Sequence, residues 1–213
     1  MNEIFNQIEN IAITPVVVLH NVIDVEPLIN ALLEGGLPCA EITFRTDVAE
    51  ECIKLISKKY PQVLLGAGTV LTIDQADRAM DAGSQFLVAP GLNPKLVEHC
   101  LKKNYPICPG VMTPSELDFA VSNFGLEALK FFPSEQVGGV NVIKAISAPY
   151  PNVRFMPTGG INASNVEKYL AFEKVFACGG SWMVKSSLVD EGRFDEIVKL
   201  TREAVDIIKK VRG

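Results

Sequence analysis

The 213-residue sequence has few of the groups from which a metal site or a disulfide network is built. It contains two histidines, His20 and His99, which lie far apart, and five cysteines, none of them in a Cys-x-x-Cys pair. A zinc ribbon needs paired cysteines and a catalytic zinc site needs several histidines, so the sequence favours neither. The odd number of cysteines also disfavours a disulfide framework, and we expect most of them to be small apolar core residues.

Long hydrophobic runs and an excess of positive charge are also missing. The most apolar early stretch, residues 11–19, contains Pro15 and is too short to span a bilayer. The first ten residues carry Glu3 and Glu9 but no lysine or arginine, so no signal peptide is predicted. A formal net charge of -5 disfavours a nucleic-acid partner, and a hydrophobic fraction of 48% excludes a disordered chain. We therefore expect a cytoplasmic protein without a membrane or nucleic-acid partner.

The sequence does contain a repeat of short apolar runs, whose centres are 20 to 26 residues apart. The runs are rich in residues that favour strands and are bounded by glycine or proline. They lie at residues 16–19, 40–43, 63–65, 86–88, 105–107, 128–131, 153–155 and 174–177. Amphipathic stretches lie between them, and the residues predicted to cap these helices are Asp24, Asp47, Thr72, Asn93, Thr113 and either Asn162 or Ser164.

Eight strand–helix units without a break in composition predict one α/β domain over residues 1–213. The alternation predicts a parallel sheet, and eight such units predict a closed (β/α)8 TIM barrel, which we expect to begin with a short N-terminal helix. A doubly wound open sheet is the alternative. That fold usually carries a glycine-rich dinucleotide fingerprint after its first strand, where this chain has Leu19-His20-Asn21. The later Gly66-Ala67-Gly68 has Leu71 in place of the third glycine.

Barrel enzymes place their sites at the C-terminal ends of the strands, so polar residues there are the candidates for chemistry. Lys130 stands in the apolar run 128–131, where an unpaired ammonium would be costly to bury. Strand alternation puts Lys130 on one face with Ala128 and Phe132, and that face points into the barrel if Leu129 and Phe131 pack on the helices. A buried lysine can be a nucleophile toward ketones. A lysine that snorkels to the barrel mouth or forms an ion pair is the alternative.

The second predicted strand offers a carboxylate and a guanidinium. Glu41, Thr43 and Arg45 share one face by the two-residue period of a strand. On an inward face, these groups suit a general acid/base and a clamp for a substrate carboxylate. A purely structural ion pair between Glu41 and Arg45 inside the barrel is the alternative.

Glycine-rich loops follow several strands. Gly66-Ala67-Gly68-Thr69 lets a ligand approach the backbone, where Thr69 offers a hydroxyl, although a plain tight turn would use the same residues. Thr158-Gly159-Gly160 and Gly179-Gly180-Ser181 follow the seventh and eighth strands, where barrels often bind phosphate. The alternative to a phosphate site is that the two glycine pairs serve only as turns that reverse the chain. Pro90, which follows the fourth predicted strand, is expected to shape a wall of the site. Together these groups predict Schiff-base chemistry on a keto acid that also bears a phosphate.

Several of these motifs, in this order, are shared with a known family. They are Glu41-Ile-Thr-Phe-Arg45-Thr, Gly66-Ala-Gly-Thr69-Val, Ala89-Pro90-Gly91, Pro109-Gly110, Lys130-Phe-Phe-Pro133, Pro157-Thr-Gly-Gly160 and Gly179-Gly-Ser-Trp182. Over essentially its whole length the chain resembles the 2-keto-3-deoxy-6-phosphogluconate (KDPG) aldolases, which are also 4-hydroxy-2-oxoglutarate (KHG) aldolases. The resemblance implies a homotrimer of (β/α)8 barrels that uses no metal and no other cofactor.

The resemblance also implies a role for each site residue. Lys130 would be the Schiff-base lysine and Glu41 the general acid/base. Arg45 and Thr69 would hold the pyruvate carboxylate. The remaining substrate-binding residues would be Pro90 and Phe132 as pocket walls, Thr158 as the reader of hydroxyl stereochemistry, and Gly159, Gly160, Gly180 and Ser181 as the phosphate cradle.

The reaction implied by the resemblance is a class I, Schiff-base cleavage of 2-dehydro-3-deoxy-6-phosphogluconate to pyruvate and glyceraldehyde 3-phosphate, as in the Entner-Doudoroff pathway. Cleavage of 4-hydroxy-2-oxoglutarate to pyruvate and glyoxylate is expected as a second reaction. The expected partner is thus a small phosphorylated keto acid. The alternatives are a 2-dehydro-3-deoxy-6-phosphogalactonate aldolase, and a phosphate-binding barrel enzyme or sensor that forms no Schiff base.

Overall fold

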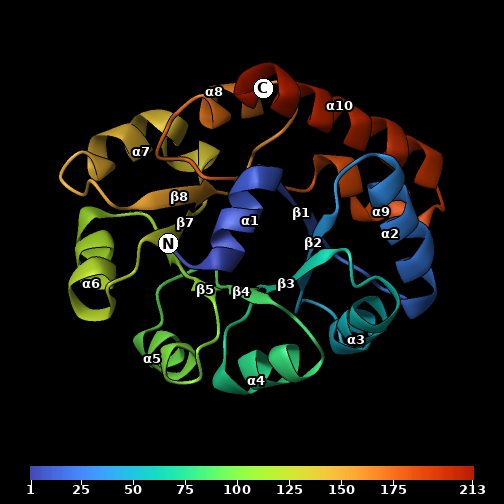
Figure 1. Cartoon of the computed structure of the whole chain (residues 1–213), viewed down its shortest axis with the longest axis horizontal. Helices are drawn as coiled ribbons and strands as arrows, with labels where there is room; N and C mark the ends of the chain where they lie inside the picture. The colour runs from blue at the N-terminus through green and yellow to red at the C-terminus, as the bar shows by residue number, and fades with distance from the viewer.

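A computed structural model describes residues 1–213 and begins with the short helix α1, Glu3–Ile11. The side chain of Asn2 caps this helix by accepting a hydrogen bond from the Ile4 backbone N–H at 2.9 Å. The helix ends at Ala12, which adopts a left-handed conformation. It buries Phe5 and Ile8, and Figure 1 shows it lying across one end of the strands. The predicted N-terminal helix is confirmed.

Nine short strands occupy the eight strand positions of a parallel barrel. β5 and β6 are separated only by Pro109 and together occupy one position, where β5 pairs with β4 and β6 pairs with β7. β1 pairs with both β2 and β9, and single bridges join Phe155 to Val175 and Thr158 to Gly179, which closes the ring. The strands are β1 Ile13–Val17, β2 Cys39–Thr43, β3 Leu64–Gly68, β4 Phe86–Val88, β5 Ile107–Cys108, β6 Gly110–Val111, β7 Ala128–Phe131, β8 Arg154–Pro157 and β9 Cys178–Gly180. The predicted TIM barrel is confirmed.

The helices surround the strands and cover their outer faces (Figure 1). They are α2 Val25–Glu34, α3 Ala49–Lys59, α4 Ile73–Asp81, α5 Pro94–Lys102, α6 Pro114–Phe124, α7 Gly139–Ser147, α8 Val166–Leu170, α9 Ser186–Asp190 and α10 Phe194–Arg212. The predicted caps at Thr72, Asn93 and Thr113 are confirmed, and Thr113 forms a full capping box with Glu116. Asp24 stands at the N-cap of α2 as predicted, but its side chain makes no cap bond. The predicted cap at Asp47 is wrong, because Val48 stands at the N-cap of α3.

Three strands lie away from their predicted positions. The fifth was expected at 105–107 and runs over Ile107–Cys108 and Gly110–Val111. The first was expected at 16–19 and runs over Ile13–Val17, and the eighth was expected at 174–177 and runs over Cys178–Gly180. The first and eighth strands pair with each other, with Ile13 opposite Cys178 and Pro15 opposite Gly180. Apolar runs report burial rather than hydrogen-bonded pairing, so they placed these strands a few residues from where the ladder forms.

The apolar core has two parts. The larger lies between the strands and the helices and includes Leu129 and Phe131. The smaller fills the barrel interior beneath the site and is closed by α1, with the ring of Phe5 packed edge-on against Phe176. Its buried members are Phe5, Ile8, Cys39, Leu64, Phe86, Val88, Cys108, Ala128, Met156, Phe176 and Ala177. This end of the barrel is a packed core, so any chemistry must take place at the other end.

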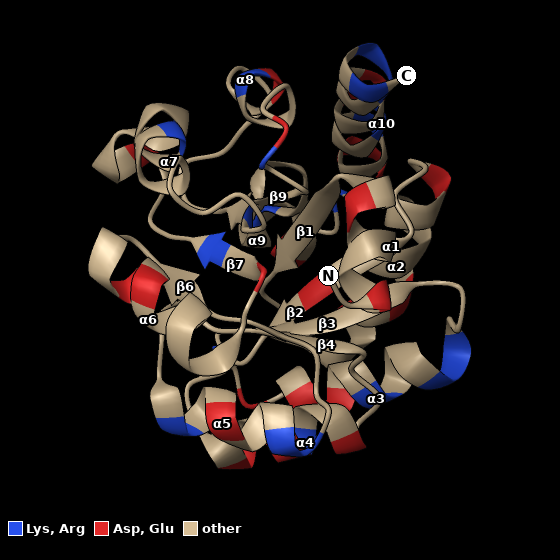
Figure 2. Cartoon of the chain, turned by 60° about the vertical axis from the view of Figure 1, so that its left-hand side comes forward, with Lys and Arg blue, Asp and Glu red and all other residues tan.

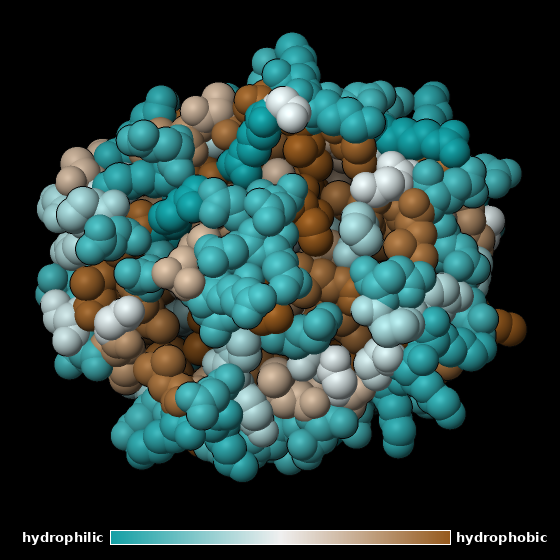
Figure 3. Space-filling model, in the orientation of Figure 1, coloured by the Kyte–Doolittle hydropathy of each residue, from teal (hydrophilic) through white to brown (hydrophobic).

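Arg212, the last residue of the C-terminal helix α10, holds this helix against the barrel. Arg212 donates hydrogen bonds to four backbone carbonyls, those of Leu170, Val175, Phe176 and Glu9. Charged side chains otherwise lie mainly on the outer helices (Figure 2), and no helix is long and apolar enough to cross a membrane. Figure 3 shows the face that carries α1, where apolar side chains gather near α5 and α6 within a largely polar surface.

Candidate active site

Glu41 projects from β2 into the barrel and is completely buried. Thr43 is also buried and donates a hydrogen bond from Oγ1 to the carbonyl oxygen of Val17 at 2.9 Å. Neither carboxyl oxygen of Glu41 has a hydrogen-bond partner within the chain. Room for the carboxyl comes from Gly68 on the adjacent strand β3, because a Cβ there would lie 2.0 Å from Oε1 of Glu41. A glycine is therefore needed beside the carboxyl.

Burial raises the pKa of the Glu41 carboxyl, because its anion would lose hydration without gaining a hydrogen bond. The positive charges of Lys130 and Arg45 lower the same pKa but do not outweigh the burial. None of the ion pairs in the chain joins Glu41 to either residue. The structural ion pair considered from the sequence is not formed. The geometry instead leaves a carboxyl that holds its proton more tightly than an exposed glutamate does.

Lys130 lies in β7, between Gly110 of β6 and Met156 of β8. Its strand neighbours Leu129 and Phe131 belong to the outer core, whereas Ala128 belongs to the inner one, so the lysine faces the barrel interior as predicted. Figure 2 shows this basic position in β7 and the acidic one in β2. The residue is only 5% exposed, and it is not a lysine that snorkels to solvent. Its Nζ lies 5.2 Å from the ring centre of Phe132.

Arg45 and Thr69 meet above these two groups. Arg45 follows β2 and donates a hydrogen bond from Nε to the hydroxyl of Thr69, which follows β3, at 3.2 Å. Thr69 has a φ of 56°, in the left-handed region, which costs a non-glycine residue about 1–2 kcal/mol. Such strain is concentrated at functional sites. The contact joins the ends of two neighbouring strands into one polar rim.

A cavity of about 350 Å³ opens at the C-terminal ends of the strands. It brings together seven of the residues predicted for the site, which are Arg45, Phe132, Thr158, Gly159, Gly160, Gly180 and Ser181. Thr158 is 7% exposed, and its hydroxyl occupies space that a Cβ on Gly179 would fill. Glu41, Lys130 and Thr69 are not among the residues that line this cavity. Pro90 lines a separate hollow of about 280 Å³ with Leu71 and Leu92.

The two glycine loops present free backbone donors to the cavity. Gly159 and Gly160 have φ angles of 99° and 76°, which place the loop in a conformation that glycine adopts readily. The N–H groups of Gly159, Gly160, Ile161 and Ser181 donate no hydrogen bond within the chain. Several unpaired N–H groups around one cavity form a site suited to an anion.

Sequence analysis missed several residues of the same cavity. Lys185 lines it four residues after Ser181 and forms no ion pair with any acidic side chain. The other missed residues are Val16, Val18, Ile161, Val184 and Ser186. A basic residue so soon after a predicted phosphate loop was a signal for Lys185. The apolar members carry no such signal, because valine and isoleucine are equally common in the core.

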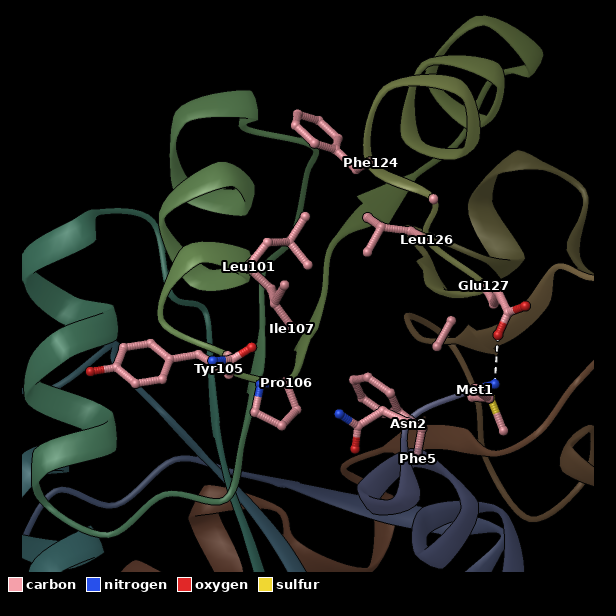
Figure 4. A pocket seen from close by; sticks show the side chains of 13 residues that line it. Met1, Asn2, Phe5, Leu101, Tyr105, Pro106, Ile107, Phe124, Leu126 and Glu127 are labelled. Atoms are coloured by element: carbon pink, nitrogen blue, oxygen red, sulfur yellow. Dashed lines mark ion pairs between the residues drawn. The ribbon is translucent and has the colours of Figure 1, made fainter.

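A second cavity, of about 260 Å³, lies at the opposite end of the barrel (Figure 4). It is lined mostly by apolar side chains, among them Phe5, Leu101 and Phe124. Two of its polar groups, the amino terminus and the Glu127 carboxylate, pair with each other, and Asn2 caps α1. It contains none of the residues predicted for chemistry. No three His, Cys, Asp or Glu side chains come together anywhere in the chain to offer a metal site.

Comparison with known proteins agrees with this geometry. Residues 4–200 match the family described as "Aldolase: KDPG and KHG aldolase". The chain is 46% identical to the 2-dehydro-3-deoxy-phosphogluconate aldolase of Treponema pallidum, over 98% of this chain and 99% of that one. It is 41% identical to the KHG/KDPG aldolase of Escherichia coli, over 91% of each chain.

Solved structures show the same relationship. The KDPG aldolase of Legionella pneumophila, with pyruvate captured as a covalent carbinolamine intermediate, superposes with a TM-score of 0.89 at 36% identity, over 93% of this chain and 96% of that one. The KDPG aldolase of Zymomonas mobilis with 3-phosphoglycerate gives a TM-score of 0.87 at 36% identity, over 94% of each chain. The family match, the identity over nearly the whole length and the shared fold together show that this chain belongs to the KDPG and KHG aldolase family.

Proposed function

We propose that this protein is a class I aldolase that cleaves 2-dehydro-3-deoxy-6-phosphogluconate to pyruvate and glyceraldehyde 3-phosphate, and 4-hydroxy-2-oxoglutarate to pyruvate and glyoxylate. The observation that carries the proposal is a buried Lys130 without an ion-pair partner, whose charge acts on the buried Glu41. Its Nζ lies 5.2 Å from the ring centre of Phe132, which lines the cavity with the free N–H groups. The captured carbinolamine of the Legionella relative supports covalent chemistry on pyruvate in this family. The activity is that of a carbon–carbon lyase.

In the first half of the reaction, the Nζ amine of Lys130 adds to the C2 ketone of the substrate. The resulting carbinolamine loses water to give an iminium, and Glu41 supplies and removes the protons. A carboxyl with a raised pKa is suited to this task, because it can hold a proton and release it at the same site. The iminium nitrogen then withdraws electrons from the neighbouring carbon atoms.

In the second half, Glu41 removes the proton of the C4 hydroxyl, directly or through a water. The C3–C4 bond breaks, glyceraldehyde 3-phosphate leaves as the aldehyde, and the electron pair stays on C3 as an enamine. Glu41 returns its proton to C3. Water then adds to the iminium, which releases pyruvate and restores the Lys130 amine.

The other predicted residues hold the two ends of the substrate. We assign Arg45 and Thr69 to the pyruvate carboxylate, which their mutual hydrogen bond supports. Phe132 and Pro90 are the proposed walls beside the pyruvyl carbons, and Phe132 lies close to Lys130. Thr158 is the proposed reader of the hydroxyl configuration.

The substrate phosphate is assigned to the glycine loops. The proposed cradle consists of Gly159, Gly160, Gly180 and Ser181, and the unpaired N–H groups at three of these positions support it. Lys185 lines the same cavity and would add a positive charge. The cradle would distinguish the phosphorylated substrate from its unphosphorylated analogue.

We further propose that the active protein is a homotrimer. Four of the six large exposed apolar side chains are Leu71 (51%), Ile73 (40%), Met112 (39%) and Phe119 (41%). Leu71 and Ile73 lie between β3 and the first turn of α4, Met112 follows β6, and Phe119 lies on α6. Exposed apolar groups of this kind are typical of interaction surfaces. Light scattering on the eluting protein should give three times the chain mass of 23.2 kDa, and a monomer would contradict the proposal.

Borohydride reduction in the presence of pyruvate tests the chemistry. The wild-type protein should gain one reduced pyruvyl adduct, mapped by peptide mass spectrometry to Lys130, and Lys130→Met should gain none. Cleavage of the gluconate and galactonate substrates, which differ in configuration at C4, should then be compared to settle the aldehyde partner. A folded wild-type protein without an adduct would overturn the Schiff-base mechanism and favour the non-covalent barrel enzyme or sensor.

A further inference from the structure

The backbone N–H of Ile161 is the last free donor of the glycine loop, and two asparagines outside the cavity set its orientation. The amide nitrogens of Asn162 and Asn165 both donate hydrogen bonds to the carbonyl oxygen of Gly160, at 3.1 and 2.9 Å. Asn165 stands at the start of α8, but its side chain makes no cap bond there. The cap predicted for this helix at Asn162 or Ser164 is wrong, because Asn165 stands at its N-cap.

Three successive carbonyls of this loop accept hydrogen bonds. The oxygen of Thr158 accepts from the Ser134 N–H at 2.8 Å, and that of Gly159 accepts from the Glu135 N–H at 3.1 Å. The oxygen of Gly160 has no backbone donor and accepts only from the two asparagine side chains. The first two peptide planes are thus fixed by the chain after β7, and the third by side chains alone.

A trans peptide points its carbonyl and the following N–H in opposite directions. When the carbonyls of residues 158 to 160 point toward their donors, the N–H groups of Gly159, Gly160 and Ile161 must point away from them. All three N–H groups are free of partners within the chain, and all three residues line the cavity. The held carbonyls therefore explain why the loop presents three donors together.

Both asparagine side chains are themselves fixed. Oδ1 of Asn165 accepts from the Asn162 N–H at 2.8 Å, and Oδ1 of Asn162 accepts from the Ser164 N–H at 2.9 Å. Each amide is thus oriented with its nitrogen toward Gly160, and neither side chain lines the cavity. Their influence on a ligand must pass through the peptide between Gly160 and Ile161.

We propose that Asn162 and Asn165 are positioning residues that aim the Ile161 N–H at the terminal phosphate of the substrate. This inference rests on the proposed function and adds a donor and its supports to the phosphate site. Because either amide alone can hold the Gly160 carbonyl, the two are partly redundant. Each single alanine variant should therefore raise KM only a little. The double variant should raise KM by much more than the product of the two single-variant factors.

The test compares cleavage of 2-dehydro-3-deoxy-6-phosphogluconate with that of the same sugar acid lacking the phosphate. In Asn162→Ala/Asn165→Ala, KM for the phosphorylated substrate should rise about tenfold or more, the usual worth of a hydrogen bond to a charged group. Its kcat, the kinetics of the unphosphorylated substrate and borohydride trapping with pyruvate should stay near wild type. Asn123→Ala is the matched control, because Asn123 Nδ2 also donates to a helix carbonyl, that of Phe119, away from the site.

An unchanged KM in a folded double variant, or an equal loss for both substrates, would overturn the positioning role while leaving the aldolase assignment intact. Failure of the wild-type protein to trap pyruvate would instead overturn the proposed function itself. If the double alanine variant does not fold, Asn162→Ala/Asn165→Asp replaces it, since it retains Oδ1 of residue 165 for the backbone N–H of residue 162 but removes both donors to Gly160. Ala163→Asp, at an exposed position in the same loop, then controls for the added charge, and a loss with the phosphorylated substrate no greater than in this control would also overturn the role.

Discussion

Replacing Glu41 with glutamine should make the protein more stable above pH 5 while removing its proton-transfer activity. The carboxyl is fully buried and has no hydrogen-bond partner, and burial raises its pKa above the ordinary value of 4.5. The folded chain therefore holds this proton more tightly than the unfolded chain does. As the pH rises above about 4.5, the unfolded state ionises first, so the free energy of unfolding falls, by at most about 1.4 kcal/mol per pH unit. The fall ends at the folded pKa.

A glutamine at this position cannot ionise, so the variant lacks this loss. Relative to wild type its free energy of unfolding should therefore increase as the pH rises above about 4.5, by at most about 1.4 kcal/mol per pH unit, until the folded pKa of Glu41 is reached. Urea unfolding followed through the single tryptophan, Trp182, at fixed protein concentration measures the difference. The same variant should exchange the C3 protons of pyruvate far more slowly, although pyruvate still binds.

The sign of the pH dependence decides between two effects. Lys130 and Arg45 stabilise the Glu41 anion, whereas burial opposes it. If attraction outweighed burial, the glutamine variant would lose stability relative to wild type as the pH rises, and that result would refute the reasoning. Glu116→Gln is the opposite control. Burial raises the pKa of Glu116, but hydrogen bonds from Met112 and Thr113 outweigh it and lower the pKa overall. The free energy of unfolding of Glu116→Gln should therefore be lower than that of wild type, and the difference should be largest at higher pH.

Three further changes test the site. Ser181→Asp should reduce cleavage of the phosphorylated substrate far more than cleavage of 4-hydroxy-2-oxoglutarate, through like-charge repulsion, and equal losses in steady-state assays would argue against a phosphate cradle. Lys185→Gln should raise KM for the phosphorylated substrate about two- to fivefold, since the side chain is exposed, and the difference should shrink at high salt. Gly68→Ala places a Cβ 2.0 Å from Glu41 Oε1, so kcat should fall about tenfold or more because the carboxyl is displaced. A Gly68→Ala enzyme with wild-type kcat would contradict this packing.

The sequence alone identified the features that depend on local order along the chain. The recurrence of short apolar runs predicted the barrel, because each strand–helix unit shows its own periodicity. The two-residue alternation placed Lys130 inside, since Leu129 and Phe131 mark the opposite face. Caps such as Thr113 with Glu116 were predictable because donor and acceptor lie three residues apart. The motif order was also sufficient to identify the family.

Features that depend on pairing between distant segments were decided only by the tertiary structure. The shifts of the first and eighth strands follow from their pairing with each other, residues 13–15 against 178–180, which hydrophobic patterns do not encode. The space that Gly68 leaves for Glu41, and the carbonyls of the Thr158 loop held by residues after β7, join positions that lie far apart in sequence. A sequence states which groups are present, but which donors remain free and which carboxyl loses its water depends on what the folded chain packs beside them.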